Sequence, residues 1–371
     1  MASPPYRLDG HVLSFRIGSA EIRRLAIIGD RYDDAGAASG REHDLTRLVA
    51  LPGLADCHAH LAADSLAEVG KGGELPPIRK RAFAQLQRGV FLILDKGWRD
   101  EVVLTLSEEA PSSRPEVYAA GRIITGVAGY FPGFAVETDE AGLAAAVAAA
   151  DTRGGWVKLI GDWPQKSRGP VINFGEEALA AAVNVAHRAG AKVAVHTMAP
   201  DTPSMAVRAG VDSIEHGLYL TAEDIATLGS RGGAWVPTIG NTVGVVASLG
   251  PGSTGARILG QGLENVRALL REAPAAGAAV LAGTDFGFPH GEVWREVSQL
   301  REFGLSAEQA VDAAGPAAYR YMGMDTLTAG ASADLLLFEG NPATDLDLLG
   351  KPAAGVRAGG VVFDHAGIFQ D

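Results

Sequence analysis

The stretch Leu51-Pro-Gly-Leu-Ala-Asp-Cys-His-Ala-His60 reads as a buried strand that ends in two histidines two residues apart. In an extended strand, residues i and i+2 point to the same face. The pattern therefore predicts that His58 and His60 present two imidazoles to one metal ion, while Cys57 and Ala59 point the other way. The same spacing also fits two solvated loop histidines, so a metal site needs further ligands from elsewhere in the chain.

Such ligands occur where other strand-like runs end: Lys158, His196, His216 and Asp285. We predict eight short strands in this part of the chain, near Leu51–His60, Val90–Asp95, Val117–Ala120, Trp156–Ile160, Val193–His196, Ser213–Glu215, Ala234–Pro237 and Val280–Asp285. Amphipathic helical patterns lie between most of them, including Glu176–Ala189, Pro203–Ala209, Ala222–Ser230 and Ala256–Ala273.

Strands that alternate with helices over residues 51–327 predict an α/β fold, a (β/α)8 barrel, which usually takes about 250 residues. From His60 onward, the intervals between the five candidate ligand positions correspond to about three, one, one and two βα units of about 30 residues. The candidates then fall on strands 1, 4, 5, 6 and 8. All lie at C-terminal strand ends, the face where barrel enzymes carry their active sites.

Both ends of the chain have a different sequence pattern, in which short strand-like runs are separated by turns. These runs are Val12–Ile17, Glu21–Ile28, Ala333–Phe338 and Ala358–Phe363. We therefore predict a small β domain from residues 1–50 and 328–371, next to a barrel of residues 51–327.

Composition excludes several classes of protein. Hydrophobic residues make up 47% of the 371 residues, and the net charge of -12 without a basic cluster argues against a nucleic-acid or anionic-membrane partner. The single cysteine, Cys57, excludes an intramolecular disulfide and a thiolate-cluster metal site. Neither a signal peptide nor an apolar run of membrane-spanning length is found, so we expect a cytoplasmic protein with a small-molecule substrate. The sequence leaves open whether copies associate into a homo-oligomer.

Seven short motifs are spread over nearly the whole chain: Leu51–His60, Gly155-Trp-Val-Lys-Leu159, Val195-His196, Ser213-Ile-Glu-His-Gly217, Trp235-Val-Pro-Thr238, Gly283-Thr-Asp-Phe-Gly287 and Ala333-Asp-Leu335. Together they resemble the amidohydrolase superfamily, in the branch of prolidase-like and imidazolonepropionase-like enzymes. The resemblance implies a metal-dependent TIM barrel flanked by a β-sandwich that both chain ends build.

The candidate ligands are nitrogen and oxygen donors without sulfur. Such a set suits Zn2+, and Mn2+, Co2+ and Fe2+ are alternatives. By the resemblance, His58, His60 and Asp285 hold one ion, and His196 and His216 hold a second.

Lys158 is the unusual member of this set, because an ammonium group has no lone pair and is repelled by two dications. It either forms a salt bridge, contacts substrate, or carries CO2 as a carbamate. A carbamate is anionic and has two oxygens that can bridge two metals, as relatives do from a strand-4 lysine. The resemblance therefore favours an N6-carboxylated Lys158 and a binuclear site.

The implied reaction is hydrolysis of a carbon–nitrogen bond other than an ordinary protein peptide bond. A metal-bridging hydroxide attacks the carbonyl of an amide-type bond, and Asp285 shuttles the proton to the leaving nitrogen. An N-acyl amino acid, a dipeptide, a lactam or a cyclic imide would be the substrate. A mononuclear hydrolase or deaminase is one alternative, although no glutamate follows His196 as in the family's deaminases. A non-catalytic scaffold is the other, and the complete ligand set argues against it.

Five residues that follow predicted strands are candidate substrate contacts: Tyr219, His290, Arg122, Tyr130 and Trp163. Trp163, with Phe131 and Phe134, suggests a partly apolar pocket. Tyr130 stands where relatives often have the histidine of a Gly-Gly-His motif, so their recognition of a substrate carboxylate is not carried over. Glu215 is expected to face away from His216, as a buried structural carboxylate.

Overall fold

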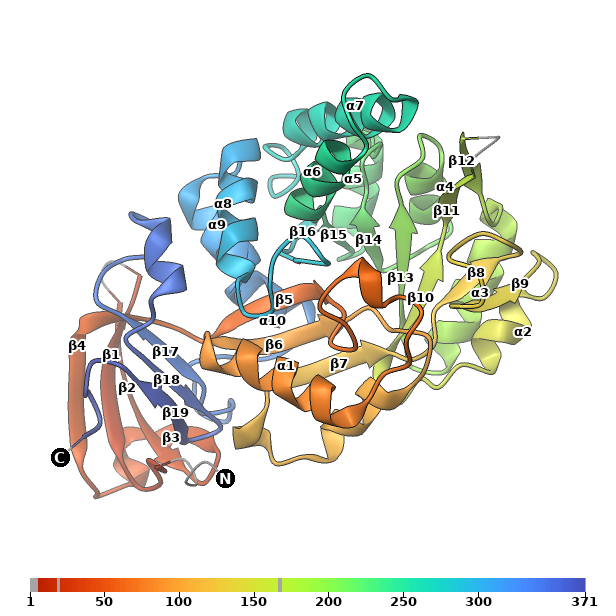
Figure 1. Cartoon of the computed structure of the whole chain (residues 1–371). Helices are drawn as coiled ribbons and strands as arrows, with labels where there is room; N and C mark the ends of the chain where they lie inside the picture. Colours follow the sequence, from red (N-terminus) through yellow and green to blue (C-terminus); the bar gives the residue numbers. More distant parts are fainter. Residues whose placement is uncertain (1–5, 19–20, 166–168, 371) are drawn as a thin grey trace.

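The computed structural model describes residues 6–18, 21–165 and 169–370, and two large sheets organise it (Figure 1). The smaller one has seven strands in the order β19-β18-β17-β4-β1-β2-β3. They are β1 (Val12–Ile17), β2 (Glu21–Ile28), β3 (Arg31–Asp34), β4 (Glu42–Leu51), β17 (Leu335–Phe338), β18 (Ala354–Arg357) and β19 (Gly360–Asp364).

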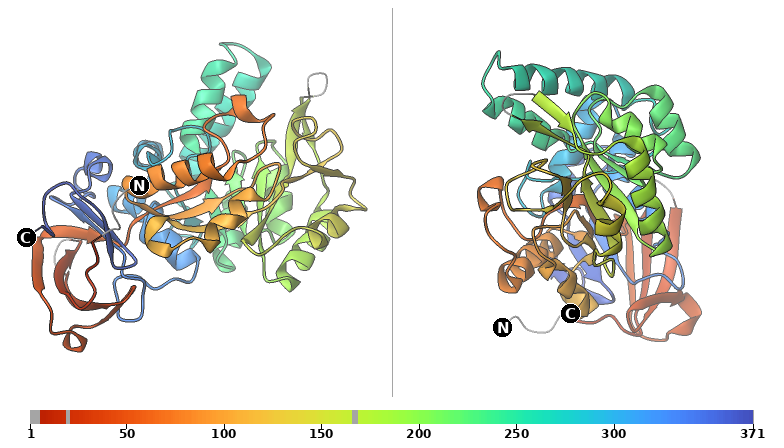
Figure 2. Two further views of the ribbon diagram at one scale, coloured as in Figure 1. Left: turned by 60° about the horizontal axis from the view of Figure 1, so that its bottom comes forward. Right: turned by 90° about the vertical axis from the view of Figure 1, so that its right-hand side faces the viewer.

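Strands from the two ends of the chain meet in this smaller sheet, where β4 and β17 pair antiparallel with Leu51 opposite Leu336. One hydrophobic cluster extends across this sheet, from Tyr32 on its edge strand β3 to Val356 near the other edge. The left view of Figure 2 shows the sheet at the side of the larger unit, and in the right view it lies mostly behind that unit. The domain limits near residues 50 and 328 stay a prediction.

The larger sheet contains the eight parallel strands of the predicted barrel, in the order β16-β15-β14-β13-β10-β7-β6-β5. They are β5 (Leu54–Ala59), β6 (Val90–Asp95), β7 (Glu116–Ala120), β10 (Gly155–Ile160), β13 (Lys192–Thr197), β14 (Ser213–His216), β15 (Ala234–Val236) and β16 (Ala279–Val280). Short strands in the connections are β8 (Ile124–Gly126), β9 (Val136–Thr138), β11 (Asp162–Gln165) and β12 (Gly169–Ile172).

The last and first strands of this sheet are joined through backbone hydrogen bonds beyond the short strand β16. The amide of Cys57 donates to the carbonyl of Ala282 over 2.8 Å, and the amide of Asp285 donates to that of His58 over 2.6 Å. The predicted α/β fold with eight parallel barrel strands is confirmed. Strand 8 is shorter than predicted, but the segment that follows it still lies against strand 1.

Helices surround the barrel strands, and the four helices predicted from the sequence are present. The helices are α1 (Leu75–Gln87), α2 (Leu143–Ala148), α3 (Glu176–Arg188), α4 (Thr202–Arg208), α5 (Ala222–Ser230), α6 (Ile239–Ser248), α7 (Thr254–Leu269), α8 (Val293–Phe303), α9 (Ala307–Ala313) and α10 (Pro316–Tyr321). Short 3-10 helices are η1 (Ala35–Ala37), η2 (Leu66–Glu68), η3 (Val102–Glu108), η4 (Pro111–Ser113) and η5 (Leu346–Gly350). Within the described ranges, none of the helices has both the length and the apolar character needed to cross a bilayer.

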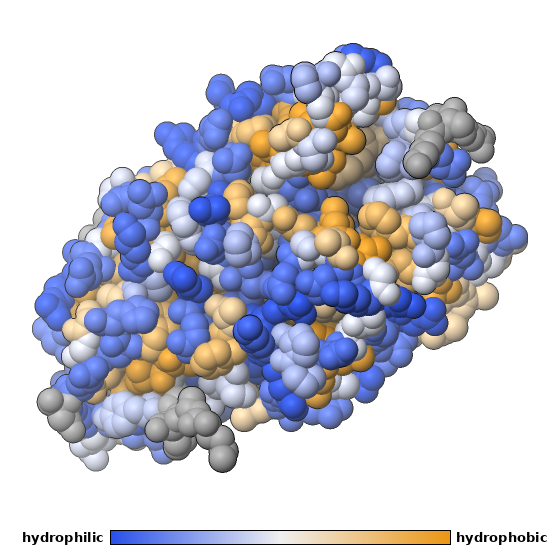
Figure 3. All heavy atoms as spheres, in the orientation of Figure 1, coloured by the Kyte–Doolittle hydropathy of each residue, from blue (hydrophilic) through white to orange (hydrophobic). Residues whose placement is uncertain are grey.

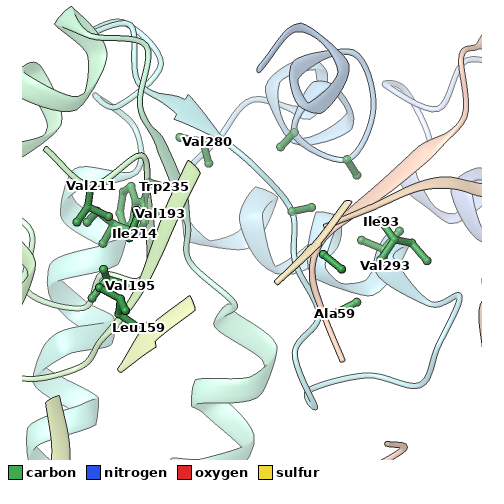
Figure 4. Packing of buried hydrophobic residues seen from close by; sticks show 14 of the residues in the cluster. Ala59, Ile93, Leu159, Val193, Val195, Val211, Ile214, Trp235, Val280 and Val293 are labelled. Carbon is green, nitrogen blue, oxygen red and sulfur yellow. The ribbon is translucent and has the colours of Figure 1, made fainter. Parts of the chain in front are cut away.

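The main core lies between the strands and these helices. Figure 4 shows it around Val195, Ile214 and Trp235, which are fully buried. Side chains of this size bury enough apolar surface to contribute about 1.5–3 kcal/mol each. Helices α6 and α7 follow strand β15 and project beyond the other helices, away from the small sheet (Figures 1 and 2).

A second cluster fills the barrel interior, and it corrects one expectation. Cys57 packs there with Leu92 and Trp156, whereas Ala59 belongs to the core beneath the helices. The pairing of β5 with β6 shifts register between Asp56 and Ala59, so the alternation assumed for this strand does not hold. A bulge of this kind redirects side chains next to functional sites, and here Cys57 lies inside the barrel.

A buried ion pair connects the small sheet to the barrel. Arg357 on β18 is 3% exposed and lies 2.9 Å from both Asp334 and Glu116 of strand β7. Replacing one partner leaves buried charge unpaired, so Arg357→Met should lower the free energy of unfolding by about 3–5 kcal/mol. Denaturant unfolding measures this. Arg320→Met, which removes an exposed pair with Asp312, is the matched control; equal effects of the two changes would contradict the expectation.

Candidate metal centre

The ends of strands 1 and 8 bring three metal-ligating side chains together. Ligand atoms of His58, His60 and Asp285 all lie within 4.8 Å of one another. The Nε2 atoms of His60 and His58 are 3.5 and 4.0 Å from Oδ1 of Asp285. These three residues, predicted from the sequence as ligands of one ion, therefore form a cluster in which one cation can contact all three.

Local backbone geometry makes this approach possible. A Cβ atom at Gly283 would lie only 2.6 Å from Cβ of His58, so a larger residue there would push strand 8 away from strand 1. Asp285 itself has a left-handed backbone with φ of 50°, and His216 and Thr238 at the ends of neighbouring strands also have positive φ values, of 61° and 46°. Non-glycine residues rarely adopt this conformation, and such strain gathers at functional sites.

Two of the histidines have their Nδ1 atoms occupied by hydrogen bonds. Nδ1 of His60 lies 2.8 Å from the carbonyl oxygen of Gly97. Nδ1 of His216 lies 2.5 Å from the hydroxyl of Thr238, which itself donates to the Pro237 carbonyl and so accepts from the ring. These partners place the proton on Nδ1 and leave the Nε2 lone pair free for a metal.

His58 is held by a carboxylate instead. Its Nδ1 lies 2.6 Å from Oε2 of Glu215, whose other oxygen is 3.1 Å from Nζ of Lys96 and accepts from the hydroxyl of Ser213. Burial alone would raise the pKa of Glu215, but Lys96 and then Lys158 bring it below its usual value. Glu215 is therefore an anion that orients the His58 ring.

The position of Glu215 corrects the expectation that it faces away from the site. Alternation along strand 6 ends at His216, because its left-handed backbone turns that ring toward the site as well. Both residues consequently reach the ligand cluster. Lys96 was not singled out in the sequence, although it directly follows Asp95 at the end of strand 2; a buried cation can be recognised only once its carboxylate partner is placed.

The remaining predicted ligands lie on the other side of this cluster. The rings of His196 and His216 are 4.6 Å apart, and those of His58 and His216 are 5.2 Å apart. Nε2 of His196 and Nζ of Lys158 are buried, and neither has a hydrogen-bond partner among the described residues. Buried polar atoms are normally paired, so such orphans indicate a missing ion, group or water. A metal and a carboxylated lysine fit these two atoms.

Electrostatics keeps the ligands in the form that binds metal. Burial lowers the pKa of His60 and of His196 to about 3, and the pKa values of His58 and His216 lie well below 6.5 for the same main reason. Neutral imidazoles offer a lone pair. Burial also lowers the pKa of Lys158 to about 8, which increases its neutral amine fraction near pH 7, the form that reacts with CO2.

Asn241 on α6 is a further contact that the sequence did not suggest. Its amide nitrogen donates to Oδ2 of Asp285 over 2.7 Å. That bond fixes the orientation of the carboxylate and leaves Oδ1 directed toward the histidines. An asparagine in the first turn of the helix that follows a predicted strand carries no sequence signal of this role.

The five candidate substrate contacts are placed differently. Tyr130 and Trp163 lie together, with ring centres 4.5 Å apart, and Trp163 is 5.6 Å from His196. The hydroxyl of Tyr219 donates to the carbonyl of Ile258 on α7. His290 lies 2.9 Å from the carbonyl of Ala63, and Arg122 is exposed. The geometry therefore associates Tyr130 and Trp163 with the ligand cluster, and the other three roles stay predictions.

Glu215→Gln tests the orienting carboxylate. The amide keeps the shape but loses the charge that holds His58, and removing such a partner typically weakens metal affinity about 10- to 100-fold. Competition with a chelator measures the dissociation constant. Glu223→Gln, an exposed residue of α5, serves as control. Unchanged affinity in Glu215→Gln would show that His58 needs no such support.

Comparisons with known proteins come from sequence and from structure. Residues 167–362 match the model described as the amidohydrolase family. Uncharacterized proteins of Mycobacterium bovis and Mycobacterium tuberculosis are 35% identical over 312 residues, which is 81% of this chain and 82% of each relative.

Among solved structures, a Xaa-Pro dipeptidase with bound methionine has a TM-score of 0.76 at 22% identity, covering 95% of this chain and 99% of the other. A. niger ochratoxinase has a TM-score of 0.78 at 20% identity, covering 96% of each chain. Molinate hydrolase has a TM-score of 0.74 at 17% identity, covering 99% of this chain and 97% of the other. These likenesses are likenesses of fold.

Proposed function

We propose a metal-dependent mechanism for this chain, which belongs to the amidohydrolase family and is a hydrolase that acts on carbon–nitrogen bonds. The observation that carries the proposal is the convergence, at C-terminal strand ends, of four neutral imidazoles, one carboxylate and a buried lysine that has no hydrogen-bond partner among the described residues. No sulfur ligand lies among them, which favours Zn2+ with Mn2+, Co2+ and Fe2+ as alternatives.

In this proposal His58, His60 and Asp285 hold one ion, and His196 and His216 hold the second. The bound ions would polarise a substrate carbonyl and lower the pKa of a water molecule toward about 7. In His58, His60 and His216, Glu215, the Gly97 carbonyl and Thr238 lie against Nδ1, which leaves Nε2 for a metal. Nε2 of His196 has no hydrogen-bond partner among the described residues.

Lys158 would contribute to the site as a carbamate. Its buried Nζ has no hydrogen-bond partner among the described residues, and as an ammonium it would repel both ions. Carboxylation would replace the positive charge with a negative one and would add two oxygen donors. With a carbamate, the site would carry negative charge to balance two dications. With an ammonium, the lysine would add a positive charge next to them.

Asp285 moves the proton. Oδ2 of Asp285 is held by Asn241, and Oδ1 lies beside His60, where it can accept a proton from the attacking water. Returned to the leaving nitrogen, that proton completes the hydrolysis of an amide-type bond. General acid–base catalysis of this kind typically contributes about 10²- to 10⁴-fold.

The test is a screen of matched small amides with the metal-loaded protein and with protein stripped by a chelator. The panel contains N-acyl amino acids, dipeptides, lactams and cyclic imides. It is broad because the structurally similar enzymes are named for dissimilar substrates, and a shared fold does not transfer substrate specificity. We expect metal-dependent release of an amine or ring-opened acid. Equal turnover by stripped and loaded protein would contradict the proposal.

A mononuclear hydrolase is the second candidate. His58, His60 and Asp285 offer three ligand atoms within 4.8 Å of one another, whereas the second set has only two histidines besides Lys158. In that case Lys158 would remain an unmodified amine, and His196 would be free to contact substrate.

A further inference from the structure

A continuous series of aromatic contacts runs from one half of the candidate metal centre to the other. On the side of strand 1, Phe286 stacks on His60 with ring centres 5.1 Å apart and an interplanar angle of 11°. On the side of strand 5, Trp163 lies 5.6 Å from His196. Both aromatic residues are only partly buried, unlike the histidines that they contact.

Between these ends, further rings complete the series. Trp98 contacts His60 and Phe286, and packs edge-on against Phe134 at 4.7 Å. Phe134 contacts Tyr130, and Tyr130 packs against Trp163 at 4.5 Å. Trp98 and Phe134 are 2% and 3% exposed, so they support the series from behind.

We call the partly exposed members, Tyr130, Phe131, Trp163 and Phe286, the aromatic wall. Phe131 belongs to it through its contacts with Tyr130 and Trp163, at 4.8 and 4.9 Å. A substrate whose scissile bond lies at the histidines has this wall beside it, because Phe286 contacts His60 and Trp163 contacts His196. Aromatic side chains that are left partly exposed beside a reacting centre offer flat apolar surface for a ligand.

Exposed apolar side chains also occur in the connections between barrel strands. Six of the nine exposed large hydrophobic side chains among the described residues lie there. They are Leu66, Phe83, Val127, Ile172, Val243 and Leu249. Apolar side chains also gather beneath α7 on the face that Figure 3 shows. Singly exposed apolar side chains are normal on soluble proteins, so only the aromatic wall points to a ligand.

From the aromatic wall we infer that the amide substrate carries an aromatic or similarly bulky apolar group that packs on Tyr130, Phe131, Trp163 and Phe286. This inference rests on the proposed function, because it assumes that the scissile bond lies at the histidines. It narrows the substrate class to amides with such a group, and it makes Trp163 a residue that determines specificity.

The test uses two ketones that cannot be hydrolysed as amides. In 4-phenylbutan-2-one and butan-2-one, a methylene replaces the nitrogen of N-benzylacetamide and N-methylacetamide. Calorimetry with the metal-loaded protein should give about 10- to 100-fold tighter binding of the phenyl ketone, the gain expected from burying one phenyl group. Equal dissociation constants, or no detectable binding of the phenyl ketone at millimolar concentration, would overturn the inference.

Variants assign the preference to the wall. Trp163→Ala should reduce the ratio of the two dissociation constants about tenfold, Trp163→Phe should keep most of it, and Phe83→Ala on the exposed face of α1 should leave it unchanged. Thermal unfolding checks that each variant is folded. A ratio that survives Trp163→Ala and a matching Phe131→Ala would also overturn the inference.

Turnover of the two amides is measured separately, because it reports on the proposed function. If metal-loaded protein hydrolyses both amides equally and the ketones bind equally, the reaction stands and the inference fails. If the phenyl ketone is preferred but neither these amides nor the wider panel is hydrolysed, the aromatic wall stands and the proposed reaction fails.

Discussion

Asp285→Asn should lower turnover at least about 100-fold, the lower bound of what a positioned acid–base group contributes. Asparagine keeps one oxygen donor and nearly the same shape, but it cannot accept a proton from water at any useful pH. The loss should therefore appear in kcat, with a smaller change in KM. Steady-state kinetics on the best amide from the screen gives both parameters.

Metal content must be measured on the same preparation, since Asp285 is also a candidate ligand. His58 and His60 remain in the variant, so we expect occupancy to fall less than activity. Asp312→Asn, which alters an exposed ion pair on α9, is the matched control. Near-normal turnover of a metal-replete Asp285→Asn would mean that another group carries the proton, and His290 would be tested next.

Lys158→Ala should lose one metal equivalent and lower turnover about 10²- to 10³-fold, because the Lewis-acid contribution of a metal ion is several kcal/mol. The variant removes the only group proposed to bridge both ions. Lys192→Ala on the neighbouring strand β13 changes a partly exposed lysine and should have no such effect.

Chemical rescue distinguishes a bridging carbamate from a lysine that acts as a cation. Acetate or propionate in the space left by Lys158→Ala supplies a carboxylate in place of the carbamate, and should restore part of the metal content and activity. Rescue by methylamine instead of a carboxylate would contradict the carbamate and support a cationic lysine.

The barrel and its eight strands were predictable because their signal is local. A barrel strand is buried on all sides and therefore appears as a short apolar run, such as Val90–Asp95. A surrounding helix is buried on one side and therefore appears as an amphipathic segment, such as Glu176–Arg188. The candidate ligands were predictable for a related reason. Each ends a strand, and parallel strands in a barrel bring their C-terminal ends to one face.

What the sequence missed depends on local exceptions and on long-range contacts. A bulge in β5 places Cys57 inside the barrel, and the left-handed His216 brings Glu215 and His216 to the same site. Neither departure follows from alternation along a strand. The contacts of Lys96 with Glu215, and of Asn241 with Asp285, join residues far apart in the chain, so each becomes visible only when both partners are placed.

The aromatic wall was only partly predictable from the sequence. Trp163 and Phe131 were noted as a source of apolar character, but their order around the histidines could not be derived from the sequence. Phe286 directly follows a candidate ligand, and its stacking on His60 depends on the turn at Asp285. Loop conformation of this kind carries specificity and has little periodic signal.

The most direct test of a binuclear amidohydrolase is a metal titration. Protein stripped with a chelator is titrated with Zn2+ in the presence of bicarbonate, and amide hydrolysis is followed against metal equivalents determined by elemental analysis. The account predicts negligible turnover without metal and a rise that ends near two equivalents per chain. Full activity at one equivalent, or activity that is unaffected by stripping, would contradict it.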